Sequence, residues 1–271
     1  MISMDWKDRL IKDTLDFIER KLPQKDYDID IVYNAYPQRI DNKVPHAVIT
    51  LVGKTLGSKI CKDADKYFGF YEYLLAEKGE NGRIIFAYIM ARAIKKKPDI
   101  FIEYLEKFLF STKDQKSCNL VIDKSIFPIL KKNPKKYLDL LVKWIKKDNS
   151  ILNQSIQKLL IKLIHFDKNL IEPIFHKLET SWLYATPSMV KLHISFLKAI
   201  YPIDPKFYLS VYEHYKSTRN PTFADILCNA ICCYDKTIRN MVDLWATSGN
   251  IKLKKIGVHG QKTIEKKKGR A

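Results

Sequence analysis

The chain has 271 residues, 46% of them apolar and 29% charged, so it can bury a sizeable core and disorder is excluded for most of it. Only 9 residues are glycine, which disfavours glycine-rich phosphate loops and turn-dense β sandwiches. No stretch approaches the ~18 consecutive apolar residues of a membrane span, and residues 1–8 contain no apolar signal region. We therefore expect a cytoplasmic protein with no membrane partner.

The net charge of +18 is concentrated in two segments. Residues 1–91 carry 14 basic and 14 acidic side chains, residues 92–147 carry 15 and 6, residues 148–248 carry 11 and 9, and residues 249–271 carry 8 and 1. Segregated positive charge is typical of proteins that bind a polyanion. The alternative is that the many lysines only keep the protein soluble.

The hydrophobic periodicity is helical along almost the whole chain. The first expected helix carries an apolar stripe from Trp6 to Ile18 and ends before Pro23. Residues 23–45, which contain three prolines, are expected to form an irregular connection, and only residues 29–32 alternate faintly like a strand. Apolar runs of helical period then recur at residues 46–61, 65–78, 82–97, 99–111, 120–132, 135–147 and 150–165. The sequence predicts an all-α chain of about a dozen helices.

A proline-led pattern repeats along the chain. Pro98, Pro134 and Pro205 each stand in a first helical turn, where the missing N–H would have no partner in any case. Apolar residues follow each proline at four, seven and ten positions. Weaker copies begin near Lys168 and Lys236, so successive anchors are 31 to 37 residues apart, the length of one helix pair with its turns.

Such a unit cannot bury its apolar face alone, so neighbouring units are expected to stack into a solenoid with an extended concave binding surface. We expect a right-handed superhelical solenoid of HEAT- or ARM-like antiparallel helix pairs, about six in number. It would occupy residues 1–248 as a single domain, with residues 1–45 as an N-terminal helix and irregular connection. Residues 249–271 would form a mobile basic tail. A compact helical bundle is the alternative.

The chain offers few motifs for metals or cofactors. Cys228 and Cys232 share a helix face, but no His or second Cys pair stands at zinc-site spacing, which favours small buried thiols. Gly53-Lys54-Thr55 is similar to the end of a phosphate loop but lacks the glycine five positions upstream. We expect neither a metal nor an organic cofactor.

Lysine runs stand at the expected turns between helices. They are Lys95, Lys96, Lys97, Lys131, Lys132, Lys135, Lys136, Lys146 and Lys147, with Lys254 and Lys255 in the basic tail. In a solenoid that stacks in register, these turns would lie along one edge and present a positive stripe to the phosphates of a duplex. The alternative is that the lysines are solvated and only cap helix C-termini.

Three segments carry a resemblance to a known family. They are Gly82-Arg83-Ile84-Ile85-Phe86-Ala87, Tyr104-Leu105-Glu106-Lys107 with Ser111-Thr112-Lys113, and Asn133-Pro134 through Leu141-Val142-Lys143-Trp144-Ile145 to Asp148-Asn149. Through them residues 72–147 resemble the HEAT-like-repeat DNA alkylation repair glycosylases of the AlkD type. The similarity extends loosely to residues 222–264.

The resemblance implies a concave, positively charged groove that holds duplex DNA, with an aromatic pair and an Asp at the damaged base. Asp123 is the expected catalytic carboxylate, and Trp144, Trp182 and Tyr184 are the candidate aromatics. Residues 117–123, which correspond to the family's active-site helix, lack its Trp, and the late helix lacks its aromatic and Arg. Because such groups stabilise charge in the transition state, we expect DNA binding with N-glycosylase activity weak or lost.

Two hypotheses follow from the sequence. The first is a monomeric HEAT-like-repeat protein that binds duplex or branched DNA, with RNA left open as a partner. The second is a solenoid scaffold that binds an acidic protein or peptide. The scaffold would expose aromatic side chains rather than lysines on its concave helices.

Overall fold

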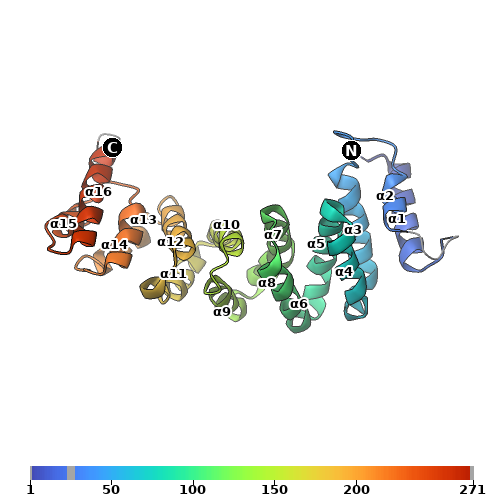
Figure 1. The fold of residues 1–271 in the computed structure, drawn as a ribbon, viewed down its shortest axis with the longest axis horizontal. Helices are drawn as coiled ribbons and strands as arrows, with labels where there is room; N and C mark the ends of the chain where they lie inside the picture. Colours follow the sequence, from blue (N-terminus) through green and yellow to red (C-terminus); the bar gives the residue numbers. More distant parts are fainter. Residues whose placement is uncertain (1, 23–27, 269–271) are drawn as a thin grey trace. The chain divides into compact units, whose positions relative to one another are not determined.

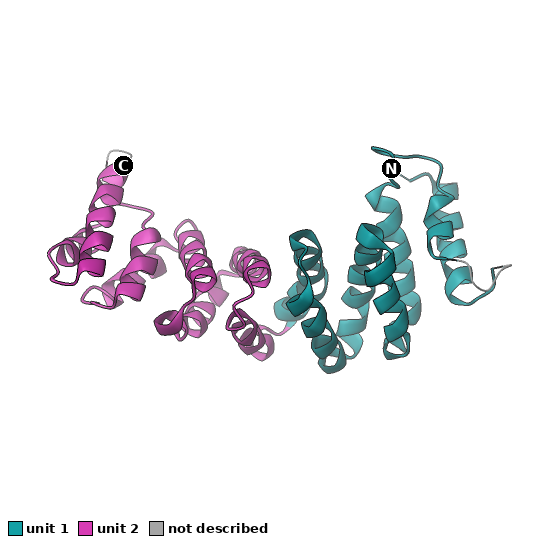
Figure 2. Cartoon of the chain, viewed as in Figure 1, with its two compact units in different colours: residues 1–132 teal, residues 133–271 magenta. Residues whose placement is uncertain are grey.

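The computed structural model describes residues 2–22 and 28–268, and over these residues the chain is helical (Figure 1). The one β feature in this part of the chain is an isolated bridge between Ile40 and Lys43. The all-α class is therefore confirmed. Internal packing divides the chain into unit 1, Met1–Lys132, and unit 2, Asn133–Ala271 (Figure 2).

Unit 1 is organised around its longest helix, α5. Its elements are α1 (Met4–Ile18), α2 (Asp30–Asn34), α3 (His46–Ile60), the 3₁₀ turn η1 (Ala64–Tyr67), α4 (Phe68–Glu77), α5 (Gly79–Lys96), α6 (Pro98–Ser111), α7 (Gln115–Val121), the π-helical turn η2 (Ile122–Ile126) and α8 (Phe127–Lys132). Helix α5 packs against α3, α4, α6 and α7. The faint strand expected at residues 29–32 is instead the start of α2, because Ile29, Val32 and Tyr33 have helical spacing and are buried together.

Two glycines allow α3 to approach α5 closely. A Cβ at Gly53 would lie 3.0 Å from Ile85 Cα, and one at Gly57 would lie 2.9 Å from the Tyr88 carbonyl oxygen. Gly53-Lys54-Thr55 thus lies within a helix, and its glycine serves helix packing rather than phosphate binding.

Unit 2 is a series of helices joined by short turns. Its elements are α9 (Pro134–Ile145), α10 (Ser150–Phe166), η3 (Lys168–Leu170), α11 (Ile171–Glu179), η4 (Trp182–Tyr184), α12 (Pro187–Ile200), α13 (Pro205–His214), α14 (Pro221–Asn229), α15 (Lys236–Ala246) and α16 (Ile251–Lys268). Asn133, Asn149, Asp204, Asn220 and Asp235 cap five of these helices by accepting hydrogen bonds from first-turn N–H groups.

The helices of unit 2 form two layers. The second helix of each successive pair packs against the next one, α10 on α12, α12 on α14 and α14 on α16. In the other layer α9 packs on α11 and α13 on α15, and the rings of Phe175 and Phe207, 5.6 Å apart, join α11 to α13. Each helix of the α10, α12, α14 and α16 layer therefore has one face turned away from the first-helix layer.

The C-terminal segment differs from the mobile arm expected of a lysine-rich tail. Residues 251–268 form helix α16, which packs on α15 and α14. Its buried positions, Leu253, Gly257, Gly260 and Ile264, recur at helical spacing and form one narrow stripe. Gly257 lets α16 lie directly on the α15 backbone, and Gly260 packs against the side chains of Val242 and Cys228, so α16 belongs to the core of unit 2.

A neutral histidine is buried in unit 2 beside the Trp182 ring. His193 on α12 is 1% exposed, and its Nε2 lies 3.2 Å from Ser181 Oγ. That hydroxyl donates to the Leu178 carbonyl oxygen at 2.7 Å, so the imidazole donates from Nε2. Burial lowers the pKa of His193 to about 3, which means that protonation opposes folding.

This burial predicts an acid-sensitive stability. The unfolded chain protonates His193 near its ordinary pKa of 6.5, so the contribution to stability is complete above that pH and is lost as the pH falls toward 3. The slope is at most about 1.4 kcal/mol per pH unit. His193→Gln should flatten the fall of the melting temperature between pH 6.5 and 4.5, whereas His165→Gln, at an exposed position, should not. Equal slopes in the wild type and His193→Gln would contradict the assignment.

Candidate nucleic-acid interface

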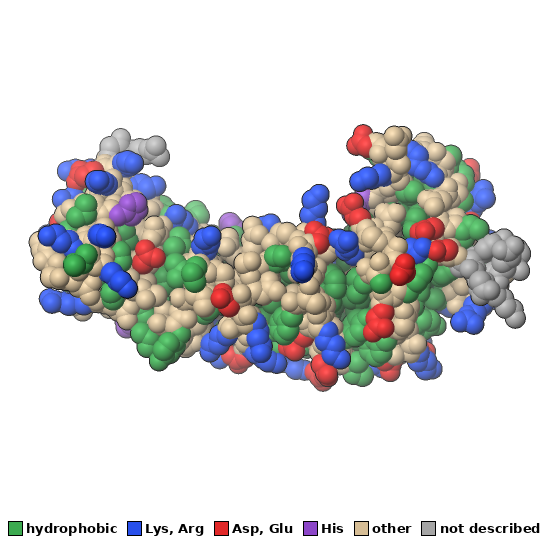
Figure 3. All heavy atoms as spheres, viewed as in Figure 1, with side chains coloured by type: hydrophobic (Ala, Val, Ile, Leu, Met, Phe, Trp, Pro, Cys, Tyr) green, Lys and Arg blue, Asp and Glu red, His purple; other side chains and the backbone are tan. Residues whose placement is uncertain are grey.

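The net positive charge differs between the two units, because their numbers of acidic residues differ. Unit 1 contains 24 basic and 19 acidic residues, whereas unit 2 contains 24 basic and only 11 acidic residues. On the face of unit 2 that Figure 3 shows, Lys and Arg side chains are widely spread, with few Asp or Glu side chains among them. A polyanion would therefore be attracted mainly to unit 2.

Within unit 2, exposed lysines lie on the outer face of the second-helix layer. On α10 they are four residues apart, on α12 seven, and on α16 seven and then four, and these spacings put the lysines of each helix on one side. This surface, the lysine face, consists of Lys158, Lys162, Lys191, Lys198, Lys255, Lys262 and Lys266, all exposed.

The helical geometry explains why these lysines point outward. On α12 the buried side includes Leu192, His193 and Phe196, and Lys191 and Lys198 lie on the opposite side. On α16 the stripe of Leu253 and its buried neighbours faces α15 and α14, so Lys255 projects away from both. The first-helix layer lies behind this face, and the lysines face solvent.

Most of these lysines have no acidic partner. Elsewhere in unit 2, Lys177 pairs with Asp139 at 2.6 Å, and Arg239 pairs with Asp243 at 2.9 Å and also with Glu265. Among the described residues, no carboxylate forms an ion pair with six of the seven lysines, namely Lys158, Lys191, Lys198, Lys255, Lys262 and Lys266. An unneutralised cationic surface releases counterions from a nucleic acid on binding.

The lysine runs of unit 1 lie at the ends of helices. Lys95 and Lys96 end α5, and Lys131 and Lys132 end α8. Lys97 is held by Asp65, its Nζ 2.6 Å from the carboxylate. These runs in unit 1 therefore lie at helix C-termini, where the helix dipole favours positive charge.

The lysines at the two ends of helix α9 contradict the expectation that all the lysine runs lie along one edge. Lys135 and Lys136 lie in the first turn of α9, and Lys146 and Lys147 follow its last residue. A helix of this length extends over about 18 Å, so the two pairs occupy opposite edges of the unit. Of the expected tail lysines, Lys255 joins the lysine face, and Lys254 is turned about 100° away from it around α16.

Most lysines of the lysine face stand outside the lysine runs of the sequence. Lys158, Lys191, Lys198 and Lys262 stand singly in the sequence rather than in clusters. The signal that identifies them is their position opposite the apolar stripe of each helix, combined with the knowledge of which helices form the second layer.

Two of the expected catalytic side chains are buried in the core of unit 2. Trp144 and Trp182 are 0% and 1% exposed, so in this fold neither can contact a DNA base. Trp144 continues the apolar stripe of Leu138 and Leu141, and such stripes face the core. Both tryptophans are therefore corrected to core residues.

Asp123 lies in unit 1, on the π-helical turn η2, and is partly exposed. Its carboxylate pairs with the neighbouring Lys124 at 2.9 Å. The Lys124 ammonium lies 5.8 Å from the centre of the Tyr88 ring, and that of Lys54 lies 5.5 Å from the same ring. Asp123 is thus accessible, but the aromatic side chain in its cluster is Tyr88 rather than a tryptophan.

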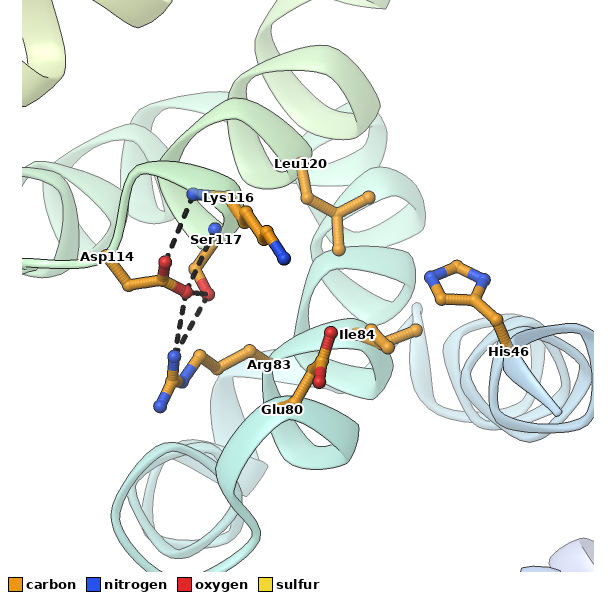
Figure 4. Close-up of a pocket in the computed structure, with 8 residues that line it drawn as sticks. All are labelled: His46, Glu80, Arg83, Ile84, Asp114, Lys116, Ser117 and Leu120. Atoms are coloured by element: carbon orange, nitrogen blue, oxygen red, sulfur yellow. Dashed lines mark hydrogen bonds and ion pairs between the residues drawn. The ribbon is translucent and has the colours of Figure 1, made fainter. Parts of the chain in front are cut away.

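A separate pocket of about 440 Å³ lies in unit 1, where the first turns of α3, α5 and α7 meet (Figure 4). Its lining combines carboxylates, basic groups and apolar side chains: His46, Glu80, Arg83, Ile84, Asp114, Lys116, Ser117 and Leu120. The Arg83 guanidinium turns toward Asp114 and Ser117, and it donates to Asp114 Oδ2 at 2.7 Å. With two carboxylates among its lining residues, this pocket lacks the charge excess of the lysine face.

Asp114 is primarily a helix cap. It accepts from the backbone N–H groups of Lys116 and Ser117 at 3.1 and 3.2 Å, and these bonds, with those from Ser117 Oγ and Arg83, hold the pKa of its carboxyl below the usual value. We expect Asp114→Ala to lower the free energy of unfolding by about 1–2 kcal/mol. Asp114→Asn keeps a capping oxygen and should lose less, and urea denaturation measures both. Equal losses would show that the ion pair with Arg83, rather than the cap, is what matters.

The cysteines also lie in the fold without a metal-binding arrangement. Cys228 is 1% exposed, its Sγ lies 3.4 Å from the Ile256 carbonyl oxygen, and burial raises the pKa of its thiol to about 12. Over the described parts of the chain, no group of three or more His, Cys, Asp or Glu side chains is placed to hold a metal ion. Over the same residues, no helix has both the length and the apolar composition needed to span a bilayer.

Comparison with known proteins adds no relative: no family model, curated protein or solved structure matches this chain. Its function is therefore inferred from the fold and from the distribution of charge.

Proposed function

We propose that this protein binds duplex or branched DNA through the lysine face of unit 2. The observation that carries the proposal is the set of exposed lysines on α10, α12 and α16, six of which have no carboxylate partner among the described residues. Phosphate contacts made by such lysines supply most of the affinity of non-specific DNA binding. The lysines come from three helices of one layer, so they can contact several phosphates at once.

The proposal includes the architecture expected from the repeats. We propose that the helix pairs are HEAT- or ARM-like and continue as a right-handed superhelical solenoid, with the second-helix layer on the concave side. The successive packing of α10, α12, α14 and α16 in unit 2 supports this arrangement. The fold would then belong with the HEAT-like-repeat alkylation repair glycosylases that residues 72–147 resemble.

Binding, rather than base excision, is the proposed activity. The two tryptophans are buried, and Asp123 is paired with Lys124. The site therefore lacks an exposed aromatic pair around a free carboxylate, the arrangement that would stabilise the charge formed as an alkylated base leaves. A base-release assay on alkylated duplex DNA tests this part of the proposal.

A scaffold for an acidic protein or peptide is the second candidate, because the same lysines would attract carboxylates. The proposal of DNA binding is favoured by the chemistry of the lysine face, which offers cations from three helices, whereas one aromatic ring beside it is exposed, that of Phe166 at the C-terminal end of α10. Buried aromatic anchors usually dominate protein interfaces.

The test is fluorescence anisotropy with labelled duplex, branched and single-stranded DNA at two salt concentrations. We expect binding as a monomer that weakens steeply as salt rises, with a polyglutamate competitor displacing DNA poorly. Absence of DNA binding at low salt would reject the proposal, and efficient displacement by polyglutamate would favour the scaffold.

A further inference from the structure

One edge of unit 2 is formed by the turns that lead from the first-helix layer to the second. Asp148, in the turn between α9 and α10, accepts hydrogen bonds from Thr186 Oγ1 at 2.5 Å and from Ser188 Oγ at 2.7 Å. These contacts tie the α9–α10 turn to the segment that precedes and begins α12. The two turns are therefore neighbours on one edge.

The next turn belongs to the same edge. Trp182 stacks on Tyr215, with ring centres 5.3 Å apart, and meets Phe223 edge-on at 5.6 Å. Trp245 Nε1 donates to the Thr218 carbonyl oxygen at 2.8 Å. The segment 181–186 is thus held by the ring contacts of the buried Trp182 on one side and by Asp148 on the other.

This edge exposes an aromatic side chain and three cations. Tyr184 is 81% exposed, the highest exposure among the large apolar and aromatic residues of the described chain, and its neighbour Leu183 is 51% exposed. Lys146 and Lys147, also exposed, directly precede Asp148, and the exposed Arg219 directly follows Thr218. Tyr184 itself stands two residues before Thr186 in the anchored segment.

We propose that Tyr184 stacks on an unpaired base of DNA while Lys146, Lys147 and Arg219 contact the adjoining phosphates. An exposed aromatic ring with lysines beside it is the arrangement by which proteins bind single strands, because every base has a π face. This inference rests on the proposed function and deepens it. It assigns unpaired or branched segments to this edge and the duplex to the lysine face.

The contacts on both sides of residues 181–186 favour this role over that of an ordinary surface tyrosine. Because the backbone of residues 181–186 is held on both sides, the ring is presented from a fixed platform, and little order has to be imposed on the protein when a base stacks on it. Among the described residues, the acidic groups tied to this edge are Asp148, engaged by Thr186 and Ser188, Glu179, engaged by Tyr215 and His176, and Glu213, engaged by Lys216 and Thr237.

The experiment compares a labelled single strand of about 20 nucleotides, a duplex with a single-stranded flap and a blunt duplex, all by anisotropy at one salt concentration. Tyr184→Ala should weaken binding to the single strand and the flap by about tenfold and leave the blunt duplex unchanged. Tyr184→Phe keeps the ring and should bind like the wild type. Tyr234→Ala removes another exposed tyrosine, 42% exposed and on the turn after α14, and should change nothing.

Photocrosslinking gives an independent readout. With 5-iodouracil in the single strand, the crosslinked peptide should contain Tyr184. If the wild type binds all three DNAs and Tyr184→Ala binds them equally well, the inference is overturned and the proposed function stands. If the wild type binds none of the three DNAs, both the inference and the proposed function are rejected. An equal loss on all three DNAs would show a general contribution to DNA binding and would also overturn the inference.

Discussion

Removing three charges from the lysine face should weaken duplex binding by ~10²-fold at 0.1 M salt, because each lysine–phosphate pair contributes several-fold to tenfold in affinity under those conditions. The variant Lys158→Gln, Lys191→Gln and Lys198→Gln changes lysines on the adjacent helices α10 and α12. The slope of log K against log salt should become shallower by about 0.9 for each phosphate that is no longer neutralised. Anisotropy at four salt concentrations measures both quantities.

The matched control removes the same charge from other helices of unit 2. Lys168, Lys206 and Lys236 lie in the first turns of η3, α13 and α15, outside the lysine face. Changing these three to Gln lowers the net charge equally, so a general attraction between protein and DNA would weaken both variants alike. We expect the control to keep affinity within about threefold and to keep the salt slope.

Two further variants locate the interface. Changing Lys255, Lys262 and Lys266 to Gln tests whether α16 is part of the DNA-binding surface. Changing Lys95, Lys96, Lys131 and Lys132 to Ala tests the turn lysines of unit 1. A loss of affinity confined to the unit 1 variant would move the interface away from the lysine face and contradict the proposal.

Gly257→Ala should destabilise unit 2 by about 2–3 kcal/mol, because protein interiors do not absorb even one extra methyl group where backbones touch. A Cβ at this position would meet the backbone N and Cα of Ala246 and the carbonyl carbon of Trp245, none of which is the end of a flexible side chain. To relieve the clash, α16 must move away from α15, which exposes Leu253 and Ile264. Urea denaturation followed by circular dichroism measures the loss.

Alanine substitutions at two other glycines should cost less stability than Gly257→Ala. A Cβ at Gly260 would meet the Val242 methyl groups at 2.9 and 3.0 Å and Cys228 Sγ at 3.1 Å. These are side-chain atoms that can shift, so Gly260→Ala should cost less than Gly257→Ala. Gly249 has no atom within 4 Å of such a Cβ, and Gly249→Ala should be neutral. Equal stability of the Gly249 and Gly257 variants would show that α16 does not pack as described.

Much of the helical structure follows from local sequence. Pro98, Pro134 and Pro205 begin helices where the repeat predicted, since proline suits a first helical turn and the apolar residues that follow have helical spacing. The same spacing places Trp144 on the inward side of its helix, and the structure buries it there. The resemblance implied that Trp144 contacts the damaged base, whereas its position in the apolar stripe of its helix predicts that it is buried.

Local sequence was misleading where composition and packing disagree. The many lysines of residues 249–271 predicted a mobile tail. However, Leu253, Gly257, Gly260 and Ile264 form a narrow buried stripe between the charged residues of α16. Hydrophobic burial needs only one side of a helix, so a segment can be strongly basic overall and still pack.

By itself, the sequence determined the all-α class, the positions of most helices and the excess of positive charge, because helical periodicity, caps and composition act over a few residues. The tertiary structure alone decided which lysines share a surface. Lys158, Lys191 and Lys262 are far apart in the chain and lie on one layer, whereas Lys136 and Lys146 are close in sequence and lie at opposite ends of α9. A helix advances only about 1.5 Å per residue along its axis but turns about 100°, so the face on which a charge appears depends on what the opposite side of that helix packs against.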